Sequence, residues 1–139
     1  MKQKTCLLLV VALVFLAFPS CSKRGPSGAM GAWVAGRGIL IRVTPKTVRD
    51  GRELPAVDFD NQSEGGFNIY PQKCFAWYEK SGLHQVTWEE RDRNIEVAPH
   101  ASFTGGLPID LQPPVGDKLL KVRLEFGPGP DETFTFVRK

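Results

Sequence analysis

The sequence has few of the residues from which metal centres and common active sites are built. It contains three cysteines and two histidines in 139 residues, without ligand spacing, whereas a zinc site takes three or four such ligands. It also contains no Gly-x-Ser-x-Gly motif, phosphate-binding loop or catalytic pair of carboxylates. We therefore expect no metal, no cofactor and no enzymatic activity.

A strong excess of charge of either sign is also missing. The formal net charge is +3. Removal of Lys2 and Lys4 with an export signal reduces the 18 Lys and Arg to 16, against 15 Asp and Glu, so the mature net charge is +1. No stripe of basic residues remains to follow a phosphate backbone, and we expect no nucleic-acid partner.

Amphipathic helices are the third missing feature. Fourteen glycines and eleven prolines interrupt the chain, and no segment repeats apolar residues every 3.6 positions. Without helical crossovers a parallel sheet is excluded, and an antiparallel β-sandwich of immunoglobulin-like type is expected, with a small Greek-key β-barrel as the alternative. The pattern predicts strands near residues 39–44, 55–60, 66–70, 74–80, 83–90, 94–98, 107–111, 119–126 and 132–138.

The N-terminus has the pattern of an export signal. Lys2 and Lys4 precede an uncharged run over residues 6–18, and a proline and a serine then lead to Cys21. A helix over the uncharged run would rise about 20 Å, less than the ~30 Å hydrocarbon core of a membrane. We therefore expect residues 1–20 to be a signal peptide that is removed.

The end of this signal resembles a bacterial lipobox. In that motif a cysteine follows a small residue, and here Cys21 follows Ser20. The chain departs from the motif at Phe18, where Leu is preferred, and at Pro19, where Ala or Ser is usual. The resemblance implies a bacterial lipoprotein in which Cys21 is acylated and becomes the first mature residue.

The residue after the cysteine bears on localisation. Ser22 stands where Asp would indicate retention at the inner membrane, so the resemblance implies an outer-membrane lipoprotein that faces the periplasm. Two or three acyl chains would hold it firmly in the membrane. The alternative is cleavage by another signal peptidase near residues 20–22 or 27–29, which would release a soluble periplasmic or secreted protein.

Residues 21–38 are expected to form a lipidated tether, and residues 39–139 the folded domain. The tether is rich in glycine, and as a flexible coil it would span about 20 to 25 Å. Trp33 and Val34 interrupt this composition. They indicate either an early edge strand that docks on the domain or an anchor for a partner.

Two hairpins are predicted in the domain. A turn at residues 81–82 would pair Glu79 with His84, Trp77 with Val86 and Phe75 with Trp88. That register places Trp77 and Trp88 in the core and turns Cys74, Ala76 and Tyr78 to the other face. In the second hairpin alternation predicts a core of Leu120, Val122, Leu124, Phe126, Phe134 and Phe136.

In the mature lipoprotein that the resemblance implies, Cys74 has no cysteine to pair with unless Cys21 escapes acylation. The predicted register places His84 on the opposite face from Cys74, about 16 Å along the strand, too far to act as its base. We expect a partly buried, unreactive thiol.

The aromatic residues left outside the predicted core are Trp33, Tyr70 and Tyr78, which are the candidate contacts for a partner or a glycan. We expect a monomeric, lipid-anchored envelope module that engages a protein partner without catalysis. The alternative is a β-sandwich that binds glycan or peptidoglycan.

Overall fold

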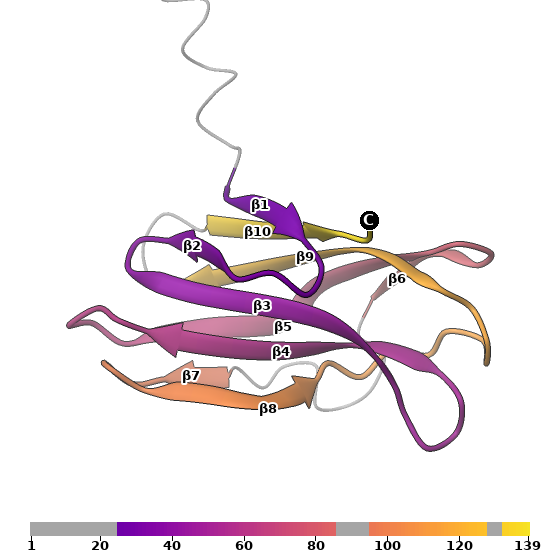
Figure 1. Ribbon diagram of the computed structural model, residues 1–139, viewed down its shortest axis with the longest axis horizontal. Coiled ribbons are helices and arrows are strands. Elements are labelled where there is room, and N and C mark those ends of the chain that lie inside the picture. Colours follow the sequence, from indigo (N-terminus) through magenta and orange to yellow (C-terminus); the bar gives the residue numbers. More distant parts are fainter. Residues whose placement is uncertain (1–24, 86–94, 128–131) are drawn as a thin grey trace, which may run out of the picture.

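The computed structural model describes residues 25–85, 95–127 and 132–139, and within these ranges it contains strands and no helix. It follows that the described residues offer no helix long and apolar enough to cross a membrane. The strands form two sheets packed face to face (Figure 1). The predicted all-β sandwich is confirmed. The alternative of a barrel is wrong, because the sheets do not close into one ring.

One sheet has six strands and mixed direction. Along the sheet the order is β1 (Ser27–Ala29), β10 (Glu132–Val137), β9 (Leu119–Gly127), β5 (Phe67–Tyr78) and then β6 (Gly82–Gln85) and β7 (Ile95–Val97). β7 pairs with the first half of β5 and β6 with its second half, and both lie on the side of β5 away from β9. The pair β1–β10 is parallel and the others are antiparallel.

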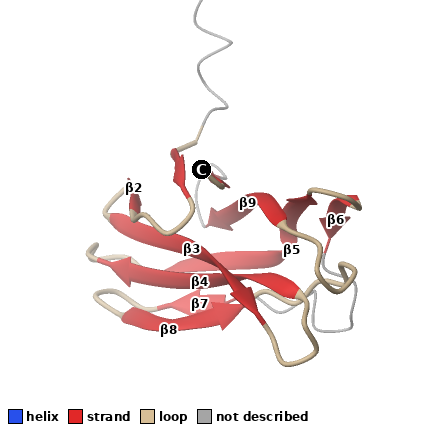
Figure 2. Ribbon diagram, turned by 45° about the vertical axis from the view of Figure 1, so that its right-hand side comes forward, coloured by secondary structure: helices blue, strands red, loops and turns tan. Residues whose placement is uncertain are grey.

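The other sheet has four antiparallel strands. The order is β2 (Val34–Gly36), β3 (Ile39–Thr47), β4 (Glu53–Asn61) and β8 (Ser102–Pro108). The central pair, β3 and β4, is joined by the turn around Gly51, and the turned view in Figure 2 shows these two strands crossing the molecule.

The core lies between the sheets and is formed by alternating apolar residues. Both sheets contribute, as the pattern predicts. Leu120 is an exception, since 38% of it is exposed. The pairing of β9 with β5 shifts at this point, from Lys121 opposite Trp77 to Leu119 opposite Tyr78, so Leu119 enters the core in its place. The side chain of Phe126 lies outside the described ones. Residues that are fully buried include Ile41, Val43, Val57, Val122, Leu124, Phe134 and Phe136.

Most predicted strands correspond to observed ones, with three differences. The segments 66–70 and 74–80 belong to the single strand β5, and the segment predicted at 107–111 begins earlier, at Ser102, and ends at Pro108. β1 was not predicted. Residues 86–90 of the segment predicted at 83–90 lie outside the described residues.

The predicted register of the first hairpin is wrong by three residues. The structure pairs Trp77 with Leu83 and Ala76 with His84, so the predicted pair of Glu79 with His84 does not form. The loop is only residues 79–81, and it is closed by Gly82, whose φ of +77° suits the left-handed residue at the end of such a loop.

The predicted core face of β5 is therefore wrong as well. The buried side chains are the small Cys74 and Ala76 together with Tyr78, and the larger Phe75 and Trp77 lie on the outer face, half-buried. Trp88 lies outside the described residues. Pairing with β9 explains this outcome, because Val122 of that strand is buried opposite Ala76 and Lys121 faces outward opposite Trp77.

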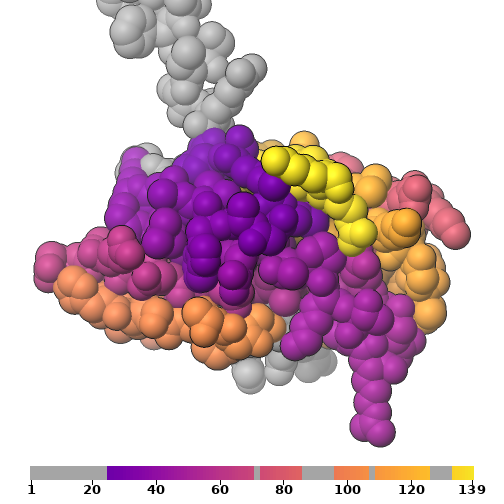
Figure 3. Space-filling model, in the orientation of Figure 1, coloured from indigo at the N-terminus to yellow at the C-terminus, as the bar shows by residue number. Residues whose placement is uncertain are grey.

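The predicted tether is wrong from residue 25 onward. β1 pairs with β10, and β2, which begins at Val34, pairs with β3, which agrees with the interpretation of Trp33 and Val34 as part of an early edge strand that docks on the domain. Figure 3 shows these first described residues, in indigo, packed beside the yellow C-terminal strand along one edge of the molecule. Residues 25–38 therefore belong to the folded domain.

Candidate functional site

The outer face of the six-stranded sheet carries a row of aromatic side chains on β5. They alternate with core residues, and the register places a charged residue of β9 opposite each: Glu125 opposite Tyr70, Arg123 opposite Phe75 and Lys121 opposite Trp77. Lys73, at the irregularity in the middle of β5, also reaches Glu125, with 3.4 Å between Nζ and Oε2. We call the surface formed by Tyr70, Lys73, Phe75, Trp77, Lys121 and Arg123 the aromatic–cationic face.

The side chains of this face hold one another in position. The Nζ atom of Lys121 lies 4.8 Å from the centre of the Trp77 ring, and that of Lys73 lies 5.1 Å from the centre of the Tyr70 ring. The centres of the Phe75 and Trp77 rings are 6.4 Å apart. A cation over an exposed ring contributes about 0.5 to 1 kcal/mol. Because these contacts already restrict the side chains, binding of a partner costs less side-chain conformational entropy.

The side chains of this face are of the kinds that bind carboxylates and apolar groups of other molecules. Aromatic rings and guanidinium groups dominate the energetics of many protein interfaces, and ammonium and guanidinium groups complement carboxylates. Leu83 of β6 lies beside Trp77 in the register and is 53% exposed, which extends the apolar part of the surface.

The four-stranded sheet has a different outer surface, around Trp33. The guanidinium carbon of Arg42 lies 4.7 Å from the centre of the Trp33 ring, and Arg42 donates hydrogen bonds of 2.9 and 2.7 Å from Nε and Nη2 to Oδ2 of Asp58. Asp58 is buried and also accepts a 2.7 Å bond from the amide of Gly106, at the irregularity of β8. These contacts connect Trp33 and the strands β3, β4 and β8 on the outer surface of the sheet.

The structure does not bring the three predicted contact residues together. Tyr70 lies on the aromatic–cationic face, whereas Trp33 is on the opposite side of the sandwich. Tyr78 is only 3% exposed, and its hydroxyl donates a 2.6 Å bond to the carbonyl of Glu53 in the other sheet. The assignment of Tyr78 to the outer surface is therefore wrong. The fourth predicted site residue, Cys21, lies outside the described residues.

A serine, a histidine and an aspartate meet at the loop between β5 and β6. The Ser81 hydroxyl lies 2.7 Å from Nε2 of His84 and 2.5 Å from Oδ2 of Asp117. Burial by itself raises the pKa of Asp117. Hydrogen bonds from the Ser81 hydroxyl and from the amides of Lys80 and Ser81 outweigh this effect, so the pKa lies below its ordinary value.

The order of these contacts differs from that of a catalytic triad. An ionised Asp117 only accepts, so the single hydroxyl proton of Ser81 goes to Asp117 and Nε2 of His84 donates to Ser81. A histidine that donates to the serine cannot remove its proton. The cluster instead clamps the hairpin loop from residue 117, far along the chain.

Cys74 is deeply buried, not partly buried as predicted. Burial raises the pKa of its thiol to about 12, so at neutral pH the thiol stays protonated and is a poor nucleophile. The placement of His84 on the opposite face from Cys74 is wrong, because His84 pairs with Ala76, which shares the core face of Cys74. The described contacts of His84 are with Ser81 and with the ring of Tyr78.

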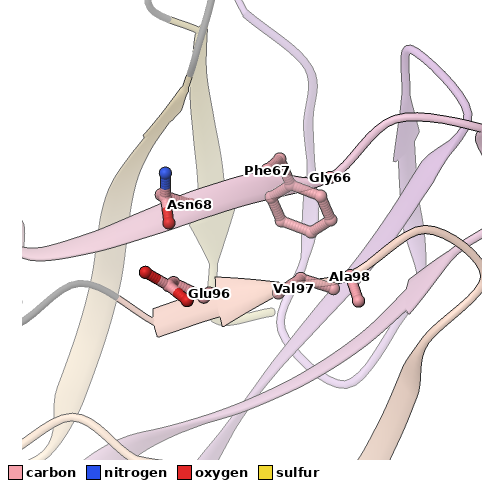
Figure 4. Close-up of a pocket in the computed structure, with 6 residues that line it drawn as sticks. All are labelled: Gly66, Phe67, Asn68, Glu96, Val97 and Ala98. Carbon is pink, nitrogen blue, oxygen red and sulfur yellow. The ribbon is translucent and has the colours of Figure 1, made fainter.

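A shallow hollow of about 440 Å³ lies between β5 and β7 (Figure 4). Phe67 and Val97 are buried there, and Asn68 faces Glu96 across the two strands. Among the described residues that line the hollow, one carboxylate and one amide are polar, and none is a nucleophile or a second carboxylic acid. In the described part of the chain no three potential metal ligands cluster, here or elsewhere.

The chain was compared with protein-family models, with curated proteins and with solved structures, and none of them matches it.

Sequence reasoning missed the aromatic–cationic face because it chose the larger side chains for the core. A usable signal lies in β9, where Lys121, Arg123 and Glu125 alternate with apolar residues and must face solvent. Any strand paired directly with β9 turns the residues opposite these charges outward. The pairing itself joins residues 41 to 59 positions apart in the chain and cannot be read from local pattern.

Proposed function

We propose that this protein is a lipid-anchored module of the bacterial cell envelope that binds a protein partner and performs no catalysis. Acyl chains on Cys21 hold it in the outer membrane, where it faces the periplasm. The lipobox-like ending of the export signal supports the anchor, and the aromatic–cationic face supports the binding function.

The single observation that carries the binding function is the pairing of β5 with β9. It places three aromatic rings and three cations on one outward sheet face, together with the carboxylate of Glu125, and Trp77 lies beneath Lys121 at one end of this row. Such a surface fits an acidic partner that offers carboxylates to the cations and apolar side chains to the rings. Confinement to one membrane raises the effective concentration of the two proteins, so that modest affinity suffices.

Photo-crosslinking in cells tests this proposal. A photoreactive amino acid replaces Leu83, which is exposed beside Trp77, and the crosslinked species is compared in two otherwise matched variants. Trp77→Ala should abolish it, whereas Trp33→Ala should retain it, since Trp33 also stacks with a cation but lies on the other sheet. Equal crosslinking in both variants would exclude the aromatic–cationic face as the contact.

The anchor is tested separately by Cys21→Ala. This variant should lose the mass of the acyl chains and move out of the detergent-extracted envelope fraction. An unchanged mass and an unchanged distribution would contradict the lipoprotein proposal without affecting the binding face.

A glycan remains the second candidate, because Tyr70 and Phe75 also present outward ring faces on which sugars can stack. The test is a pull-down on purified peptidoglycan. Binding that is lost with Tyr70→Ala, without any protein crosslink at position 83, would favour this alternative.

A further inference from the structure

The chain enters the sandwich at Gly25 and is held from that residue onward. A Cβ atom at Gly25 would stand 1.7 Å from the carbonyl oxygen of Thr133, so the two backbones lie too close for any side chain. The carbonyl of Pro26 accepts a 3.0 Å hydrogen bond from the amide of Thr135, and β1 then pairs with β10. The first described residue is therefore already part of the fold.

The same segment continues into the second sheet. The amide of Met30 donates to the carbonyl of Val137 in β10, and the amide of Gly31 donates to the carbonyl of Val43 in β3, both at 2.9 Å. The chain crosses between the sheets here and joins β1 to β2 along one edge of the sandwich (Figure 1). We call this margin the entry edge.

Only residues 22–24 separate Cys21 from Gly25. Four fully extended steps of the chain reach at most about 14 Å. This reach is shorter than that of the glycine-rich tether expected from the sequence, whose seventeen residues would extend to about 60 Å if fully stretched. An acyl anchor on Cys21 therefore keeps Gly25 within about 14 Å of the anchored residue.

We propose that the entry edge rests against the phospholipid headgroups and that the opposite margin, formed by β7 and β8, points away from the membrane. This orientation depends on the acylation of Cys21 proposed above. Figure 1 shows β1 and β2 at one margin, with β7 and β8 at the other. The aromatic–cationic face then stands upright from the membrane, and β5 lies three strand spacings, about 14 Å, beyond β1.

Fluorescence quenching in vesicles tests this orientation with a matched pair of probes. Ser27 of β1 and Ser102 of β8 are both exposed serines on edge strands, and each is replaced singly by cysteine and labelled with bimane. The native Cys74 is fully buried and Cys21 is blocked when acylated, so labelling is selective. The processed protein is reconstituted into phospholipid vesicles that contain a lipid with a nitroxide on its headgroup.

The expected result is strong quenching at Ser27→Cys and at least threefold weaker quenching at Ser102→Cys. A variant with twenty Gly and Ser residues inserted between Arg24 and Gly25 should reduce the quenching at position 27 to the level at position 102. Equal quenching at the two positions with native spacing, or no effect of the insertion, would overturn the orientation.

The mass of each preparation separates the two proposals. Acylated protein with equal quenching at positions 27 and 102 refutes the orientation alone. A mature mass without acyl chains refutes the anchor, and with it the orientation, while the crosslinking from position 83 still decides the binding face.

Discussion

Replacing Tyr78 should destabilise the domain far more than replacing the larger Trp77. Tyr78 is 3% exposed, packs edge to face with His84 and donates a hydrogen bond to the carbonyl of Glu53 in the opposite sheet. Tyr78→Ala therefore removes a buried aromatic ring and leaves a partly buried carbonyl without this donor. Such a deletion costs about 3 to 5 kcal/mol. Trp77→Ala removes a half-buried ring under Lys121 and should cost about 1 kcal/mol.

Urea unfolding of residues 22–139, followed by circular dichroism, measures the difference. With a slope of about 1 to 3 kcal/mol per molar urea, Tyr78→Ala should lower the midpoint by roughly 2 M and Trp77→Ala by well under 1 M. Tyr78→Phe serves as the control, because it keeps the ring and loses only a hydrogen bond worth about 1 kcal/mol. Equal midpoints for Tyr78→Ala and Trp77→Ala, or a larger effect of Trp77→Ala, would refute the observed assignment of the two faces of β5.

Three further predictions concern groups in the fold. The pKa of Asp117 is below its ordinary value of 3.8, so ionised Asp117 contributes to the free energy of unfolding above about pH 4, and this contribution is lost as the pH falls through the lowered pKa. The difference in urea midpoint between wild type and Asp117→Asn should therefore shrink from pH 7 to pH 3, and a constant difference would contradict this prediction. Gly25→Ala should speed hydrogen exchange in β1 because of the Thr133 carbonyl, whereas Gly65→Ala, with open space around it, should not. Cys74 should react with a thiol reagent at pH 8 only in denaturant, and rapid reaction of the native protein would show that the thiol is accessible.

The sequence could predict the fold class because each central strand carries its own signal. Ile39, Ile41 and Val43 alternate with less buried residues, and Phe134 and Phe136 do the same at the other end of the domain. Local alternation of this kind depends on the two faces of one strand and on nothing distant.

The register of the first hairpin could not be predicted, because a distant residue helps to set it. Asp117 accepts hydrogen bonds from the amides of Lys80 and Ser81, both at 2.8 Å, and so fixes a loop some 36 residues away in the chain. β1 could not be predicted either. Its three residues, Ser27–Ala29, have no apolar alternation and form a strand only because β10 supplies hydrogen-bonding partners.

Only part of the aromatic–cationic face could be predicted from the sequence. Tyr70 was selected as a residue outside the core, and it lies on this face. Phe75 and Trp77 were missed because their size suggested burial, whereas the space between the sheets at β5 is filled by Cys74, Ala76 and Tyr78. Size alone is a poor guide where a cation can cover an aromatic ring, as Lys121 covers Trp77.

The parallel pairing of β1 with β10 has a consequence for the order in which the molecule is assembled. Ser27 pairs with Thr135, so the contact closes a loop of more than one hundred residues. A chain that is made from its N-terminus cannot form this contact until its last described strand has emerged, and such non-local pairings are slow to form. The contact of β1 with β10 can therefore form only after the other described strands have been made, and until β1 pairs with it the outer edge of β10 stays open to strands of other chains.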